Sequence, residues 1–264
     1  NKETFKEFEN RLKKIAIFIS KEDVLDELPE KIEIVKKVYM TEEQKRYYQE
    51  LVKFYSTVIK GKQIDTPTIL TQISKLRQIT SGFVYFKEDE KDKKSIRFYD
   101  PKLKVLKETI DEIPKERQII VWCSFKDEID KLKEEIDDSE KIYGETKPDE
   151  RARIINDFKN KKFRILIAHP QTIGHGQNLQ NASYAIYYSL DWSAEFFTQS
   201  KDRIHRPGQK NVCTYIYLLC EDSIDEVMYE KLLGKIKSTK EILERLKIIK
   251  REQPSQKTGQ KTGS

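Results

Sequence analysis

The chain has 264 residues, of which 36% are charged and 37% hydrophobic, and a formal net charge of +6. This length can bury a sizeable core, and no apolar run reaches the ~18 residues that a membrane span needs. So small a positive excess permits contact with nucleic acid without requiring it. The three cysteines form no C-x-x-C pair, which predicts reduced thiols in a cytosolic-type compartment and no zinc site.

Residues 1–99 are predicted to form a lobe-junction segment followed by a mainly helical extension. The expected elements, in chain order, are a charged helix ending near Ile19, a strand at 32–39, a helix from Thr41 to about Ile59, a helix at 68–80, and a solvated loop or hairpin tip at 87–95. In the first long helix, Tyr47, Leu51, Phe54, Tyr55 and Val58 are expected to form the buried face. The chain starts at Asn1 without an initiator methionine, and we expect it to be a fragment of a longer protein.

From Asp100 the pattern changes, and apolar strands alternate with amphipathic helices. Asp100 is a predicted N-cap with Pro101 at the first helical position. Strands are expected at 118–122, 141–143, 163–168, 183–189 and 212–219, with helices between them and a last one at 223–233. Such alternation predicts an α/β fold, a parallel sheet with helices on both faces, over residues 100–235. Residues 236–264 are expected to form a basic helix at 239–250 and a disordered tail.

The segment from Gln199 to Lys210, QSKDRIHRPGQK, carries the most informative pattern. If a helix capped by Ser193 continues through it, Gln199, Arg203 and Arg206 fall on one face in its last turns, before Pro207 and Gly208 stop it. Two planar guanidinium groups on one face suit a polyphosphate. The alternative is that Asp202 pairs with Arg206 at i, i+4 on a solvated surface.

Three loops that follow predicted strands carry further candidate residues, because ligands of an open parallel sheet meet the carboxyl ends of its strands. Ser124 and Lys126 follow the strand at 118–122, and Gly144 and Thr146 follow the strand at 141–143. Ser124 and Thr146 could instead serve only as helix N-caps. The loop after Ala168 carries Thr172, Gly174, Gly176 and Asn178, where the glycines allow close approach of a ligand to the backbone.

The pattern Q-x-x-D-R-x-H-R-x-G-Q, from Gln199 to Gln209, resembles motif VI of the Swi/Snf-type helicase-like ATPases. The phrase DVLDELPEK from Asp23 to Lys31 resembles that family's lobe junction, and the three loops resemble its motif IV, its G-x-T segment and its motif V. The resemblance implies the second RecA-like lobe of a DNA translocase. It implies arginine fingers at Arg203 and Arg206 and an ATP interface at Gln199, Asp202, Gly174 and Gly176. It also implies contacts with the DNA backbone at Ser124, Lys126, Gly144, Thr146, Thr172 and Asn178.

The sequence contains neither a G-x-x-x-x-G-K-[ST] phosphate loop nor a D-E-x-H carboxylate pair. We therefore expect ATP and Mg²⁺ to be bound mainly by a first lobe outside this chain, and this chain alone to be inactive. Its expected partners are double-stranded DNA and that first lobe, with no metal site of its own. The alternatives are a non-catalytic nucleic-acid or protein binding module, or a lobe of an RNA helicase, although Gln209 favours the Swi/Snf type. The short motifs favour a phage or bacterial member.

Overall fold

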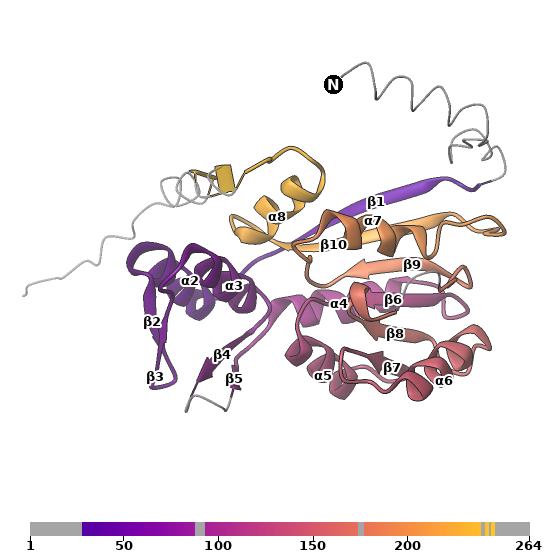
Figure 1. Ribbon diagram of the computed structural model, residues 1–264, viewed down its shortest axis with the longest axis horizontal. Coiled ribbons are helices and arrows are strands. Elements are labelled where there is room, and N and C mark those ends of the chain that lie inside the picture. Colours follow the sequence, from indigo (N-terminus) through magenta and orange to yellow (C-terminus); the bar gives the residue numbers. More distant parts are fainter. Residues whose placement is uncertain (1–27, 88–92, 174–176, 239–240, 243, 246–264) are drawn as a thin grey trace, which may run out of the picture.

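The computed structural model describes residues 28–87, 93–173, 177–238, 241–242 and 244–245 (Figure 1). Six strands form one parallel sheet in the order β1-β10-β9-β6-β8-β7. Their bounds are β1 Lys31–Val38, β6 Gln118–Trp122, β7 Ser139–Ile142, β8 Ile165–Ala168, β9 Ala182–Tyr187 and β10 Cys213–Cys220. The predicted α/β fold with a parallel sheet is confirmed. The expected helix before Ile19, most of the lobe-junction phrase, much of the expected helix at 239–250 and the tail lie outside the described residues.

Helices cover both faces of this sheet (Figure 1). They are α4 Pro101–Glu112, α5 Lys126–Glu135, α6 Pro148–Lys159, α7 Ala194–Asp202 and α8 Ile224–Leu232, with a short 3-10 helix η1 at Pro170–Ile173. Glu33 and Lys36 of β1 point to opposite faces because they are three residues apart. Glu33 pairs with Lys201 of α7 at 2.7 Å, and Lys36 pairs with Glu112 of α4 at 2.5 Å. The two helices therefore lie on opposite sides of the edge strand.

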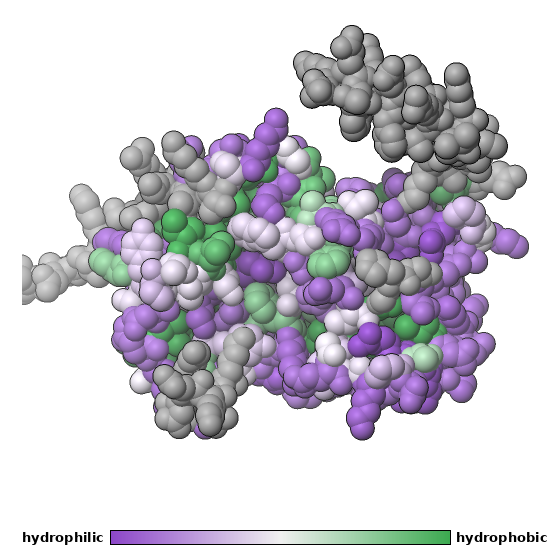
Figure 2. Space-filling view, viewed as in Figure 1, coloured by the Kyte–Doolittle hydropathy of each residue, from purple (hydrophilic) through white to green (hydrophobic). Residues whose placement is uncertain are grey.

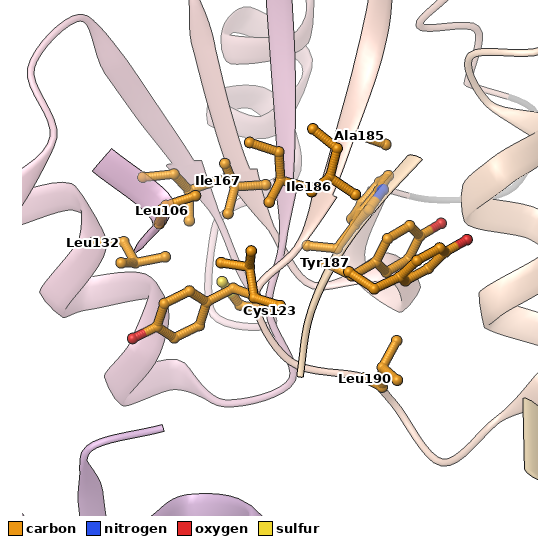
Figure 3. Close-up of a cluster of buried hydrophobic side chains, with 14 of the residues drawn as sticks. Leu106, Cys123, Leu132, Ile167, Ala185, Ile186, Tyr187 and Leu190 are labelled. Carbon is orange, nitrogen blue, oxygen red and sulfur yellow. The ribbon is translucent and has the colours of Figure 1, made fainter. Parts of the chain in front are cut away.

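Because the sheet is covered on both faces, every residue of β6 and β8 is buried, and all of them except Gln118 are apolar. Figure 3 shows Leu106 of α4 and Leu132 of α5 gathered beside Ile167 of β8. Each of these three side chains is completely inaccessible to solvent. Burying a Leu or Ile side chain stabilises a fold by about 1.5–3 kcal/mol, so this cluster is a main source of the lobe's stability.

The extension between β1 and α4 consists of a helix pair and two antiparallel hairpins. Its elements are α2 Glu42–Phe54, β2 Ser56–Ile59, β3 Lys62–Asp65, α3 Ile69–Thr80, β4 Phe83–Lys87 and β5 Lys93–Arg97. The prediction that the first helix continues to Ile59 is wrong, because Tyr55 takes a left-handed conformation with φ +60°. The carbonyl of Tyr55 then accepts hydrogen bonds from the backbone and side chain of Thr66, which fold the chain into the β2–β3 hairpin. Phe54, Tyr55 and Val58 are consequently exposed rather than part of the buried face.

A buried ionic network joins this extension to the carboxyl-terminal edge of the sheet. Lys102 of α4 is fully buried and pairs with Asp225 of α8 at 2.5 Å. Thr80, at the end of α3, donates a hydrogen bond to the same carboxylate at 2.9 Å. Lys131 of α5 pairs with Asp100 and donates to the Ser81 carbonyl at 2.9 Å. Each buried cation therefore has its own carboxylate, which is the condition under which buried charges are tolerated.

The main sheet contains a strand from each side of the predicted boundary at residue 100. β1, from the first expected segment, pairs with β10 along its whole length. The helix pair and hairpins, by contrast, contribute no strand to that sheet. We keep the three-part division as a proposal, with β1 as the point where the junction segment enters the lobe.

Candidate functional site

The loops after β6, β7 and β8 meet at the carboxyl-terminal edge of the sheet, where they line an open cavity of about 270 Å³. Three of the predicted nucleic-acid residues, Lys126, Gly144 and Thr172, line it together, each from a different loop. The remaining wall is formed by Phe125, Ile129, Tyr143, Glu145, His169 and Gln171. Parallel topology explains this convergence, because all three strands end at the same edge.

The lysines beside this cavity share one carboxylate. Lys126 and Lys141 lie 2.9 Å and 2.6 Å from the two oxygens of Asp130, and both ammonium groups stand over the ring of Tyr143. Burial opposes ionisation of Asp130, but the hydrogen bonds from Lys141 and Lys126 outweigh it and lower its pKa. The carboxylate therefore stays charged and partly neutralises both cations.

His169, also in the cavity wall, is held by Asp191 from the loop after β9. Its Nε2 lies 2.9 Å from the Asp191 carboxylate, and its Nδ1 accepts a hydrogen bond from the Gln171 backbone. The ring of the nearby Trp192 lies under Lys231, whose ammonium is 4.4 Å from the ring centre. Among the described residues, no three His, Cys, Asp or Glu side chains are grouped so as to hold a metal ion.

Ser124 and Thr146 shape their loops and do not cap the helices that follow. The N-cap residues are Phe125 for α5 and Lys147 for α6, so the N-cap alternatives are wrong. Thr146 accepts a hydrogen bond from the Tyr143 backbone at 3.1 Å and is almost fully buried. The backbone N–H of Ser124 donates to Glu128 and to Ser189, while its hydroxyl oxygen is buried with no partner among the described residues.

At the opposite, amino-terminal edge, the segment with the two arginines is a turn rather than a helix end. α7 ends at Asp202, so the prediction that Arg203 and Arg206 lie in its last turns is wrong. The His205 ring contacts the Pro29 carbonyl at 2.9 Å, just before β1. The Gln209 amide donates to the carbonyls of Gln180 and Ala182, where β9 begins. These contacts pull the chain away from the helix axis, and Gly208, with φ +94°, closes the turn.

Arg203 is the most unusual charge in the described part of the chain. It is only 6% exposed, and its Nη1 donates a long 3.4 Å hydrogen bond to the Gln177 carbonyl. Its Nε is buried and has no hydrogen-bond partner among the described residues. Burial, and then repulsion from Arg206, lower the pKa of its guanidinium. Among the described residues no carboxylate forms an ion pair with it. Such a site favours an incoming anion, because an anion supplies the missing charge and acceptor.

The other predicted residues of this region are placed as follows. Gln199 lies on α7 and its amide donates to Glu195 at 2.9 Å, while Asp202 is the last residue of that helix. Asn178 accepts a hydrogen bond from the Gln180 backbone and stands in the loop that enters β9, so it lies at the amino-terminal edge and not beside the cavity. Gly174 and Gly176 lie outside the described residues.

Sequence reasoning missed Asp130 and Gln180. Asp130 follows Lys126 at i+4 on a predicted helix, a spacing that could have indicated the ion pair. Gln180 carries a buried side-chain oxygen without a partner, beside Gly208 and near the arginine turn. Its position depends on how the loop before β9 meets the turn after α7, which local sequence does not encode.

The chain is similar to one known family and to several known proteins. A family model described as "Helicase conserved C-terminal domain" covers residues 101–208. The transcription regulatory protein SNF2 of Saccharomyces cerevisiae is 27% identical over 234 residues, which are 82% of this chain and 14% of that protein. An uncharacterized ATP-dependent helicase of Mycoplasma pneumoniae is 30% identical over 214 residues, which are 78% of this chain and 20% of that protein. The chain thus spans a fifth or less of these relatives.

Two solved structures share the fold. The C-terminal part of the Fun30 ATPase domain superposes with a TM-score of 0.64 at 18% identity, covering 85% of this chain and 98% of that one. The Sulfolobus solfataricus SWI2/SNF2 ATPase core, solved in complex with dsDNA, gives 0.57 at 24% identity, with coverages of 87% and 49%. Fold and motifs together define a C-terminal RecA-like helicase lobe.

The family match, the two yeast relatives and the shared fold support a C-terminal lobe of the Swi/Snf type of helicase-like ATPases, the type that motif VI resembles. No helix in the part of the chain that the structure describes is long and apolar enough to cross a membrane.

Proposed function

We propose that this lobe completes the ATP site of a DNA translocase by supplying Arg203 and Arg206 to ATP bound on a first lobe. The observation that carries the proposal is the buried Arg203, whose Nε has no partner and whose neighbour is a second guanidinium. A buried cation without a carboxylate costs stability unless an anion reaches it. A polyphosphate is an anion of the required charge, and two guanidinium forks suit it better than two ammonium groups.

The first lobe would hold Mg²⁺, because this sequence contains no D-E-x-H carboxylate pair to hold it. When bound, Mg²⁺ would supply neutralisation of the charge on the phosphates. Gln199 and Asp202, on the last turns of α7, are proposed to complete the interface beside the arginines. Gly174 and Gly176 belong to the same proposal, since they precede the Gln177 carbonyl to which Arg203 donates.

We assign nucleic-acid contact to the opposite edge, where Lys126, Gly144 and Thr172 line one cavity. Ser124 and Thr146 support it by shaping two of its loops. The proposed nucleic-acid contact of Asn178 would instead lie at the amino-terminal edge, in the loop before β9 and apart from this cavity. The proposed partner is double-stranded DNA, as in the relative that was solved with it. Opening and closing of the two lobes would then alternate ATP turnover at one edge with grip on the phosphate backbone at the other.

The deciding experiment measures DNA-dependent ATP turnover by the full-length protein that carries Arg203→Ala or Arg206→Ala. Arginine fingers contribute a rate factor on the order of 10³–10⁵, so both variants should lose nearly all activity. Lysine at either position should not restore it, because lysine keeps the charge but loses the planar fork. Arg153→Ala is the matched control, since Arg153 is an exposed arginine that pairs with Asp157 within α6. Near-normal turnover in both arginine variants would remove the proposal.

A further inference from the structure

The turn that carries the two arginines is held by a side chain that the proposed function does not use. We call residues 203–208 the arginine turn, and Gln209, which follows it directly, is only 4% exposed. The Gln209 amide oxygen accepts a hydrogen bond from the Asn211 backbone at 3.0 Å. Its amide nitrogen lies 2.9–3.0 Å from three backbone carbonyls, those of Gln180, Ala182 and Ile204. The reversed amide would set its oxygen against three carbonyl oxygens, so these partners fix the orientation of the amide.

These hydrogen bonds fasten the arginine turn to the start of β9. Ile204, which is completely buried, follows Arg203 in the turn, while the other two carbonyls lie where β9 begins. The loop before β9 also contacts Arg203 directly. The Leu179 N–H donates to the Arg203 carbonyl at 3.1 Å, and the Arg203 side chain donates to the Gln177 carbonyl. The Gln209 amide therefore ties the backbone beside Arg203 to the loop that Arg203 itself contacts.

The position of the arginine turn explains why it needs such an anchor. The turn follows α7, and Figure 2 shows mainly hydrophilic surface beside that helix. Hydrogen bonds of a turn near water open readily when few buried contacts hold them. Repulsion between Arg203 and Arg206 would drive the two guanidinium groups apart in a loose turn. Every polar atom of the Gln209 side chain is occupied by backbone groups, so Gln209 can hold the turn but does not bind phosphate itself.

We propose that Gln209 is a positioning residue that presets the two arginines for the nucleotide. The proposal rests on the proposed function, since it assumes that Arg203 and Arg206 meet the phosphates. Gln209 keeps the backbone of the arginine turn in one conformation before ATP arrives, so that no reorientation is needed as charge develops on the transferring phosphoryl group. Its loss should therefore slow turnover more than it weakens ATP binding, which belongs mainly to the first lobe.

Amide hydrogen exchange tests whether Gln209 holds the turn. Gln209→Met keeps the length of the side chain but removes the hydrogen bonds of its amide. Gln72→Met is the matched control, because Gln72 is also 4% exposed and donates to the Leu51 carbonyl at 2.7 Å, within the extension. In peptides that cover residues 177–182 and 203–209, we expect exchange at least about tenfold faster in Gln209→Met and little change in Gln72→Met. Unchanged exchange in both peptides, or an equal rise over the whole chain, overturns the proposal.

DNA-dependent ATP turnover by the full-length protein tests the consequence for the reaction. Gln209→Met should lower kcat by about 10- to 100-fold and leave KM for ATP within about twofold, because a misplacement of about 1 Å can cost that much in rate. Gln72→Met should leave both constants near normal. A higher KM with normal kcat, or an equal fall in kcat in both variants, overturns the positioning role.

Arg203→Ala, measured in parallel, separates failure of this inference from failure of the proposed function. If Arg203→Ala is inactive while Gln209→Met turns over normally, the arginine finger stands and only the positioning role is overturned. If Arg203→Ala turns over normally, the proposed function fails and the positioning role fails with it.

Discussion

The two edges of the parallel sheet hold their positive charges in different ways. At the carboxyl-terminal edge, Lys126 and Lys141 share Asp130, Lys102 pairs with Asp225, and Lys131 pairs with Asp100. At the amino-terminal edge, Arg203 is buried, and its Nε has no hydrogen-bond partner among the described residues. Its pKa is lowered by burial and, after that, by repulsion from Arg206.

This difference indicates which edge can neutralise a strong anion. A cation already paired with a carboxylate has little attraction left for phosphate, and binding to it remains weak and sensitive to salt. A buried cation without a carboxylate is destabilising in the free lobe and is relieved by an anion. This difference supports the proposal that the amino-terminal edge meets ATP and that the carboxyl-terminal edge makes many weak contacts with a nucleic-acid backbone.

The largest expected effect concerns what the amino-terminal edge can do alone. The isolated chain should hydrolyse no ATP above background, with or without DNA, because two arginines supply neither a phosphate cradle nor a metal site. A coupled ATPase assay on the purified chain checks this, with Arg203→Ala as a control for contaminating enzymes. DNA-stimulated turnover that this substitution abolishes would show that the edge needs no first lobe.

Removing one partner of a buried ion pair at the carboxyl-terminal edge should strongly destabilise the fold. Lys102→Met leaves Asp225 buried without its cation, so we expect a loss of about 3–5 kcal/mol in the free energy of unfolding. Lys104→Met is the control on the same helix, because Lys104 is exposed and pairs only distantly with Glu108. That control should cost less than about 1 kcal/mol. Urea denaturation of both variants gives the two values, and similar values would contradict the structural role of Lys102.

At the amino-terminal edge, removing a buried cation should instead raise the free energy of unfolding. Arg203→Met replaces a buried cation with an apolar side chain of similar length and should stabilise the isolated chain by about 1 kcal/mol. The expected rise in melting temperature is about 2–4 °C. Arg153→Met, at an exposed position, serves as the control and should change the melting temperature little. A clear fall for Arg203→Met would mean that the guanidinium is satisfied within the lobe.

The smallest effect is expected in DNA binding. Asp130→Asn removes the carboxylate shared by Lys126 and Lys141, and should tighten binding of duplex DNA roughly threefold at low salt. Fluorescence anisotropy across a salt series measures this, and the slope with salt should steepen because more cations contact phosphate. Asp111→Asn, which removes the carboxylate paired with the exposed Lys115 just after α4, is the control for a general change in net charge. An equal gain in both variants would argue against a DNA contact at the cavity.

Most of the fold could be predicted because its signals are local. Thr41, Asp100, Ser193 and Ser223 each cap the helix that the sequence assigns to them, with side-chain hydrogen bonds to the first turn. β6, β8 and β10 are mainly apolar runs, and amphipathic helices lie between several of the strands, a pattern that indicates a parallel sheet. The predicted first helix failed at Tyr55, where contacts with Thr66, eleven residues away, overrode its apolar spacing.

The candidate site shows the same division. By itself, the sequence determined the family motif with Arg203 and Arg206, and placed Lys126, Gly144 and Thr172 in loops after successive strands. Only the tertiary structure decided that α7 stops before the arginines and that Arg203 is buried without a carboxylate while Lys126 is paired. The physical reason is range: caps and periodicity act within a few residues, whereas burial and charge pairing depend on segments brought together from distant parts of the chain.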